Sequence, residues 1–325
     1  MKENAALPPW FNPRQPVNQD GHSVLFKFGC CTLLLFFSVA AALSAEASKS
    51  PGGTTYPYNS FVIPCTVEAV KFLFSTLCLF SLKVRGVQVD TSISISSMCG
   101  YMFPALCYFI SNNCMLIIIR ELGPATFQIT SNLKSLATGI LMYTVLGRKL
   151  TWLQWKALVL LVIGSIVSQI PSEDNEFSSH TTGYMYVLIN CFASGAGGVV
   201  SEKMLKNSTG VHPASIHWQN MQLYFFGFCF GMLTFAKSSA GDVSLFFAGF
   251  NLFAYATVVS LSVSGLLVSF VLKYMDNFAK CFVSGASITV VALVQAAMKD
   301  ETISLKMLLG MILTFMAIEQ YNLPQ

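Results

Sequence analysis

Long apolar stretches recur along the whole chain and are separated by short polar turns. An α-helix of about 20 apolar residues crosses the hydrocarbon core of a bilayer. Windows of that length predict an all-α polytopic membrane protein with ten transmembrane helices, at 24–46, 60–82, 97–119, 124–146, 151–170, 181–204, 213–236, 247–272, 276–298 and 303–321. The turns between them are marked by pairs such as Gly123-Pro124 and Arg148-Lys149.

The two halves of the chain share a weak pattern when it is divided near residue 175. The fourth and fifth spans carry a lysine, a charged turn and then TWLQWK, and the ninth and tenth carry a lysine, a charged turn and then ISLK. Five spans per half give the halves opposite orientations, as in transporters built from inverted repeats. We therefore expect two inverted five-helix repeats at 24–170 and 181–321, an acidic loop at 171–180, and tails at 1–23 and 322–325.

Composition agrees with a membrane protein and excludes an ordinary soluble domain, because only 10% of residues are charged and 54% are hydrophobic. Lys and Arg concentrate in the loops that share a side with both termini, so the positive-inside rule predicts that both termini are cytosolic. The ten cysteines form no CxxC pair and have no histidine at ligand spacing, which favours small buried side chains over a metal site. We expect no cofactor.

Two lysines inside predicted spans, Lys134 and Lys280, carry most of the functional information. A cation at the centre of a transmembrane helix costs roughly 2.5–3.5 kcal/mol on insertion scales. Either a salt bridge, for which Glu68 is a candidate, or a water-filled cavity that receives an anion must offset that cost. Lys71 lies three residues from Glu68 and can pair with it locally. If Glu68 pairs with Lys71, at least one of the embedded lysines has no fixed carboxylate partner, which favours a cavity that receives an anion.

Each of the two lysines has a local setting that suits an anion. Phe127, Lys134 and Thr138 share one face of the fourth predicted helix. Lys134 lies about 15 Å along that helix, near the middle of the bilayer. Lys280 lies in the first turn of its helix, after a predicted N-cap at Asp276. A lysine beside the positive end of a helix is a plausible phosphate site.

Further polar residues within the spans allow two interpretations. Asn112, Asn220, Tyr224 and Ser269 could form hydrogen bonds between helices, or they could line the same cavity. Aromatic rings to stack on and amides that donate and accept are what a nucleobase and ribose require. Gly195, within SGAGG, could allow close helix packing or let a flat ligand approach the backbone.

Several stretches together resemble a known family. NNCMLIIIRELGPATFQITSNLK (112–134), GRKLTWLQW (147–155), SGAGGVVSEKMLK (194–206), WQNMQLY (218–224) and SFVLKYMDNFAK (269–280) resemble nucleotide-sugar transporters of the drug/metabolite transporter superfamily, in particular the CMP-sialic acid transporter group. The resemblance covers most of the chain. It implies ten helices in two inverted repeats, and exchange of a cytosolic nucleotide sugar for a lumenal nucleoside monophosphate in the Golgi membrane.

The resemblance also implies roles for single residues. Lys134 and Lys280 would hold the phosphate and the acidic region of the sugar. The residues that would contact the nucleotide, or the helices around it, are Asn112, Thr138, Gly195, Asn220, Tyr224 and Ser269. Phe127 stands where these transporters tend to have tyrosine, so a hydrogen-bonding group is missing from the expected cavity and the identity of the sugar stays open.

The sequence thus favours a Golgi antiporter for CMP-sialic acid or a related CMP-sugar, exchanged for CMP. A carrier for UDP-N-acetylhexosamine is the nearest alternative. A membrane enzyme is disfavoured because no span carries paired carboxylates or a His/Asp dyad, and a scaffold would tolerate apolar residues in place of both lysines. The expected partners are small-molecule nucleotides and membrane lipid, with no nucleic acid, and the protein is expected to be a monomer or homodimer.

Overall fold

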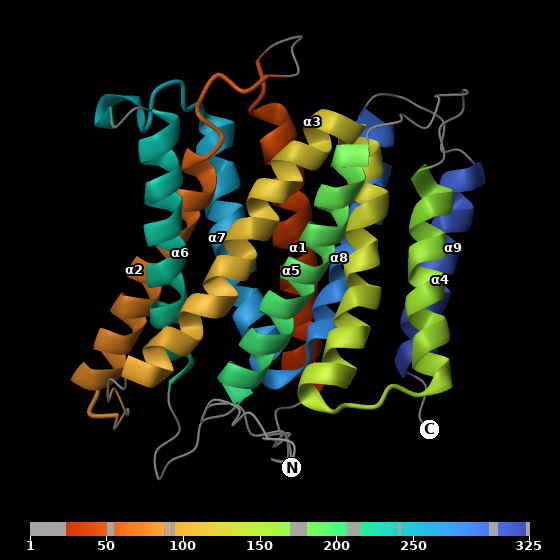
Figure 1. Cartoon of the computed structure of the whole chain (residues 1–325), viewed down its shortest axis with the longest axis horizontal. Helices are drawn as coiled ribbons and strands as arrows, with labels where there is room; N and C mark the ends of the chain where they lie inside the picture. Colours follow the sequence, from red (N-terminus) through yellow and green to blue (C-terminus); the bar gives the residue numbers. More distant parts are fainter. Residues whose placement is uncertain are drawn as a thin grey trace, which may run out of the picture.

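The computed structural model describes residues 24–50, 55–87, 89, 91, 95–169, 181–206, 215–239, 242–298 and 305–322. Within them the chain forms helices and no strand (Figure 1). The elements are α1 (Val24–Ala47), α2 (Val62–Val84), α3 (Ile95–Leu146), α4 (Trp152–Gln169), α5 (Thr181–Lys206), α6 (Ile216–Ser238), the short 3₁₀ helix η1 (Val243–Leu245), α7 (Leu252–Tyr274), α8 (Asn277–Met298) and α9 (Leu305–Asn322).

Five helical stretches are long and apolar enough to cross a membrane: Leu25–Ala47, Val62–Val84, Thr182–Lys206, Leu252–Tyr274 and Asn277–Gln295. The expectation of an all-helical, polytopic membrane protein is therefore confirmed. The tail expected at 1–23, the acidic loop expected at 171–180, and all of the tail expected at 322–325 except Asn322 lie outside the described residues.

The largest difference from the sequence prediction is α3, a helix of 52 residues that contains both the third and the fourth expected span. Its first half runs antiparallel to α5. Gly100 lies against Met204 near the end of α5. Eleven residues further along α3, Ser111 donates a hydrogen bond of 2.6 Å to Asn190, much nearer the start of α5.

The second half of α3 runs parallel to α5. Thr138 lies against Gly195, and Met142 belongs to the same buried cluster as Val199. Both helices therefore advance in the same direction here, so α3 must reverse between its halves. Figure 1 shows its ribbon turning over at one end of the bundle, although the backbone is helical through Gly123-Pro124.

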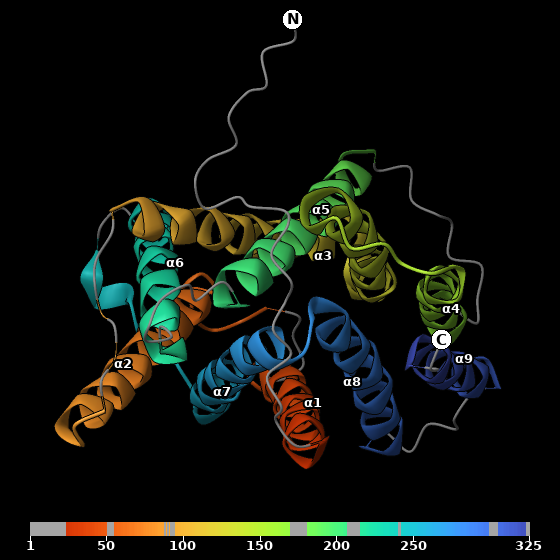
Figure 2. The same cartoon turned by 90° about the horizontal axis from the view of Figure 1, so that it is seen from below.

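The helices pack in pairs that join the two halves of the chain. The most extensive contacts are between α3 and α5, α4 and α9, α1 and α7, and α2 and α6. Seen along the bundle, α2 and α6 form one end, α4 and α9 the other, and α3, α5, α7 and α8 lie between them (Figure 2).

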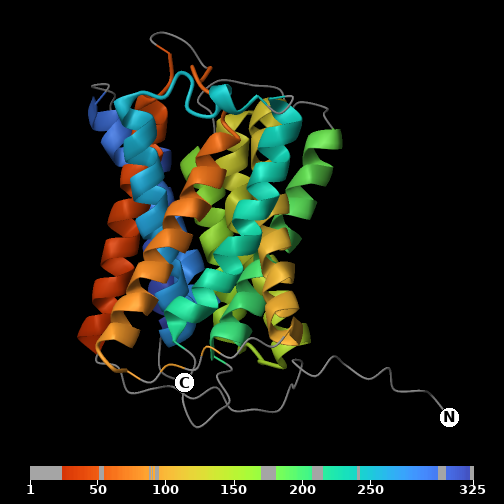
Figure 3. The same cartoon turned by 90° about the vertical axis from the view of Figure 1, so that its left-hand side faces the viewer.

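The best-buried cluster lies where five helices meet. Met142, Leu158, Val199, Phe278 and Tyr321 pack together from α3, α4, α5, α8 and α9. By contrast, many large apolar side chains, including Leu77 and Phe315, are exposed on the outside of the bundle. Figure 3 shows the helices of the bundle running along its long direction, with the connections between them at its two ends. An apolar outer surface suits a lipid environment, because lipid tails are as apolar as leucine.

Candidate functional site

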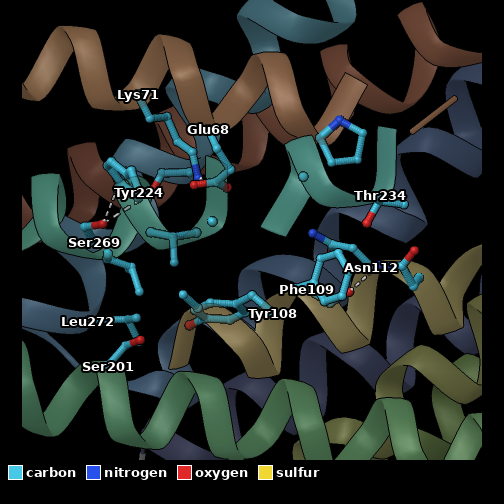
Figure 4. Close-up of a pocket in the computed structure, with 18 of the residues that line it drawn as sticks. Glu68, Lys71, Tyr108, Phe109, Asn112, Ser201, Tyr224, Thr234, Ser269 and Leu272 are labelled. Atoms are coloured by element: carbon cyan, nitrogen blue, oxygen red, sulfur yellow. Dashed lines mark hydrogen bonds and ion pairs between the residues drawn. The ribbon is translucent and has the colours of Figure 1, made fainter. Parts of the chain in front are cut away.

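A cavity of about 250 Å³ lies between α2, α3, α5, α6, α7 and α8. Helices from both halves of the chain therefore contribute to its wall. The polar and aromatic side chains that line it include Lys280 and several that Figure 4 labels: Glu68, Lys71, Tyr108, Asn112, Tyr224 and Ser269.

An ion pair on α2 forms one wall. The Lys71 Nζ lies 2.5 Å from a Glu68 carboxylate oxygen, and the two side chains are only 9% and 22% exposed. The Lys71 Nζ also lies 4.2 Å from the centre of the Tyr224 ring, within the range of a cation–π interaction. The local pairing expected from the i, i+3 spacing is therefore confirmed, and Glu68 is not the partner of Lys134.

Two glycines on neighbouring helices make room for this ion pair. A Cβ atom on Gly227 of α6 would lie 2.9 Å from a Glu68 carboxylate oxygen. A Cβ atom on Gly265 of α7 would lie 2.8 Å from the Lys71 Cδ. Because real Cβ contacts are longer than this, any larger residue would displace the pair.

Tyr224 and Ser269 meet beside the pair. Their hydroxyl oxygens are 2.8 Å apart, and both residues are buried although they line the cavity. This bond joins α6 to α7. The two residues were expected either to bind ligand or to bond between helices; the bond between helices is present, and both residues also line the cavity.

The opposite wall carries Lys280, whose Nζ lies 5.2 Å from the centre of the Tyr108 ring. Lys280 is in the first turn of α8, as expected. Asp276 caps this helix, because its carboxylate accepts a hydrogen bond of 2.9 Å from the Ala279 N–H. Asn112 follows Tyr108 by four residues and lines the same cavity. Lysine and aromatic ring thus lie together at the N-terminal end of α8, while Asn112 lies further along the cavity, near Thr234 (Figure 4).

Lys134 does not line the cavity. It is partly buried, and it is close enough to Lys280 and Cys281 to interact with both electrostatically. Thr138, one turn further along α3, is 1% exposed and packs on Gly195. A Cβ atom on Gly195 would lie 3.3 Å from the Thr138 nitrogen. These three residues therefore form a layer behind the cavity wall, and Gly195 allows close helix packing.

Asn220 and Phe127 complete the expected set. Asn220 is completely buried on α6, and its side-chain amide makes no hydrogen bond within the part of the chain that the structure describes. The side chain of Phe127 lies outside the described residues. The structure thus brings four expected residues to the cavity: Lys280, Asn112, Tyr224 and Ser269.

Sequence reasoning missed Tyr108, and it considered Glu68 and Lys71 only as members of ion pairs, not as residues that line the cavity. Tyr108 had a usable signal, because it precedes Asn112 by one helical turn and must share its face. The place of the Glu68–Lys71 pair at the cavity depends on packing between distant helices. Gly227 and Gly265, which admit the pair, show no such role in the sequence.

Comparisons with known proteins show what this chain resembles in sequence and in fold. The family model described as "Nucleotide-sugar transporter" matches residues 22–322. CMP-sialic acid transporter 1 of Oryza sativa subsp. japonica is 30% identical over 304 residues, covering 90% of this chain and 92% of that protein. The UDP-N-acetylglucosamine transporter of Bos taurus is 34% identical, covering 84% of this chain and 87% of that protein. A solved crystal structure with a TM-score of 0.70 and 11% identity covers 92% of this chain and 97% of its own, and shares the fold.

Proposed function

We propose, from the premise that this chain belongs to the nucleotide-sugar transporter family, that it exchanges a pyrimidine nucleotide sugar for a nucleoside monophosphate across the Golgi membrane. The substrates we propose are CMP-sialic acid and CMP. The observation that carries this proposal is the position of Lys280, which lies at the capped N-terminal end of α8 in a cavity between the two halves of the chain.

The phosphate of the substrate is held at Lys280 in this proposal. The Nζ atom donates to phosphate oxygens, and the positive end of the α8 dipole favours the same charge. Lys134 lies behind the wall and adds positive potential. Tyr108 offers a ring on which a base can stack, and Asn112 offers an amide that both donates and accepts. Thr138 and Gly195 hold the helices that carry these groups.

The pattern of helix contacts supports two inverted five-helix repeats. Counting the two halves of α3 as separate spans pairs each span in the first half of the chain with the span five positions later. Under this pairing, the α1–α7 contact corresponds to the α5–α3 contact, and the α2–α7 contact corresponds to the α6–α3 contact. The α2–α6 and α4–α9 contacts map onto themselves. A cavity between such repeats is the arrangement that alternating access requires.

A UDP-N-acetylhexosamine is the second candidate substrate. One observation favours it: identity to the bovine UDP-N-acetylglucosamine transporter is 34%, against 30% to the rice CMP-sialic acid transporter. Both candidates carry a pyrimidine nucleotide, so both use the same proposed phosphate site. The base and the sugar separate them.

Thermal stabilisation of the purified protein by CMP and UMP tests the proposal. A nucleotide that binds only the folded state at 100 times its Kd adds about 2.7 kcal/mol of stability. We expect one of the two nucleotides to raise the Tm. We expect the shift to disappear in Lys280→Met and to persist in Lys83→Met, which removes an exposed lysine of α2.

Uptake into liposomes then tests exchange. Vesicles loaded with the matching nucleoside monophosphate should take up labelled nucleotide sugar faster than empty vesicles. Equal uptake by both would contradict exchange, and a full nucleotide shift in Lys280→Met would contradict the phosphate site.

A further inference from the structure

A single buried carboxylate ties three helices together at one end of the cavity. Glu202 on α5 is 2% exposed. One of its oxygens accepts a hydrogen bond of 2.8 Å from the Asn277 N–H at the start of α8. The other lies 2.8 Å from the Lys206 Nζ. Lys206 in turn donates to the carbonyl of Met275, in the turn between α7 and α8.

Further polar contacts surround this carboxylate. Gln219 of α6 is 3% exposed and donates to the Met204 carbonyl of α5 at 3.0 Å. Its own oxygen accepts from the Lys273 Nζ of α7, also at 3.0 Å. Arg148, just beyond α3, pairs with Asp276 at 3.1 Å. The ends of α3, α5, α6, α7 and α8 are thereby joined on one side of the bundle.

The cavity is closed on this side and more open on the other. Leu205 and Leu272 line the cavity and are 1% and 2% exposed, and they pack with Ile216 in one buried cluster. At the far end the lining residues Phe61 and Thr234 are only partly buried. An apolar floor backed by the Glu202 contacts therefore separates the cavity from the side that carries Lys206 and Arg148.

Glu202 also connects this closed end to the helix turn that carries Lys280. Lys280 stands one turn beyond Asn277 on α8, so the hydrogen bond from the Asn277 N–H fixes the turn that presents Lys280 to the cavity. The Asn277 side chain packs directly on Gly198, one turn before Glu202 on α5. A movement of α8 away from α5 must break the Glu202 bond and shift Lys280 together.

We propose that Glu202 is a positioning residue that latches this end of the cavity: it holds Lys280 in place while the end is closed, and its release opens the end. The inference rests on the proposed function, since only a carrier must open at both ends in turn. The excess of Lys and Arg on this side assigns the latched end to the cytosol. An anion bound at Lys280 acts on the same turn of α8, so binding can bias the latch.

Glu202→Gln tests the latch while preserving shape. The glutamine oxygen can still accept from the Asn277 N–H, but the charged attraction to Lys206 is lost. Leu205→Cys reports opening, because Leu205 lies in the closed floor. In sealed vesicles, we expect a membrane-impermeant maleimide added on the cytosolic side to label this cysteine about tenfold faster in Glu202→Gln, the change that loss of one charged hydrogen bond produces. Mass spectrometry of the labelled peptide separates this cysteine from the native ones.

Glu46→Gln is the matched control. Glu46 forms a pair with Lys49 at 2.6 Å, but it is 58% exposed and lies outside the cavity. Labelling of Leu205→Cys should be unchanged by this substitution. If Glu202→Gln does not yield folded protein, Lys206→Met serves in its place, because it removes the contact with Met275 and keeps the hydrogen bond to Asn277.

Equal labelling rates in the latch variants and in Glu46→Gln would overturn the latch. Faster labelling from both sides of the membrane would also overturn it, because that result indicates general loosening. The nucleotide readout is separate. If CMP and UMP fail to raise the Tm of the unsubstituted protein, the proposed function fails, while the labelling comparison still decides whether Glu202 closes this end.

Discussion

Removing Lys71 should destabilise the protein far more than removing a lysine from an exposed pair of the same spacing. Lys71→Met deletes the cation and keeps most of the apolar stem. It leaves the Glu68 carboxylate, 22% exposed, facing the cavity without its partner, and it removes the cation from the Tyr224 ring. Lys49→Met breaks the i, i+3 pair with Glu46, whose carboxylate is 58% exposed.

The expected magnitudes follow from this difference in burial. Removing one partner of a buried ion pair costs about 3–5 kcal/mol. Because the Glu68 side chain is 22% exposed, the penalty is reduced, and we expect about 2–3 kcal/mol for Lys71→Met. Exposed pairs contribute about 0.2–1 kcal/mol, and Lys49→Met should lie within that range.

A double-mutant cycle separates the ion pair from loss of packing. The free energy of unfolding is measured for Lys71→Met, for Glu68→Gln and for the double variant. Because the cost comes from an unpaired charge, Glu68→Gln should restore about 1–2 kcal/mol to Lys71→Met. Strict additivity of the two single changes, or a Lys71→Met effect no larger than that of Lys49→Met, would refute the reasoning.

Two further changes test the packing around the site. Gly198→Ala places a Cβ 2.4 Å from the Asn277 amide, and overpacking of this kind costs about 1–3 kcal/mol. We therefore expect a lower Tm and weaker nucleotide binding. Gly29→Ala on α1, which has open space around it, is the control and should leave nucleotide binding unchanged and the Tm unchanged or higher. Tyr224→Phe removes the 2.8 Å hydrogen bond to Ser269 and should lower the free energy of unfolding by about 1 kcal/mol. Thermal unfolding of Tyr224→Phe, Ser269→Ala and the double variant checks this. A loss of stability in the double variant equal to the sum of the two single losses would argue against the bond.

The fold was predictable from the sequence wherever periodicity and length decide it. Apolar runs of about twenty residues located nearly every helix to within a few positions. The exception was α3, because Gly123-Pro124 marks a turn in the sequence while the backbone stays helical across it. The contacts with α5 also show the reversal of α3. Ser111 bonds to Asn190 where the two helices are antiparallel, and Thr138 packs on Gly195 where they are parallel.

The site was predictable to the extent that helical spacing governs it. The Asp276 cap and the place of Lys280 in the first turn of α8 follow from local sequence, as does the Glu68–Lys71 pair. The position of Lys134 does not. The helix face that carries Lys134 follows from residue spacing, but which neighbour that face meets depends on how α3 packs against α5 and α8.

The two embedded lysines at the cavity have different partners, and this difference predicts how an anion lies in the cavity. Lys71 has a carboxylate at 2.5 Å. Lys280 has the Tyr108 ring, and no carboxylate of the described residues lies within ion-pair distance of it. The net positive charge of the cavity therefore sits on the α8 side, with Lys134 behind it. A substrate with a charged phosphate and a less charged end lowers its energy by placing the phosphate at Lys280 and the other end toward Glu68 and Lys71.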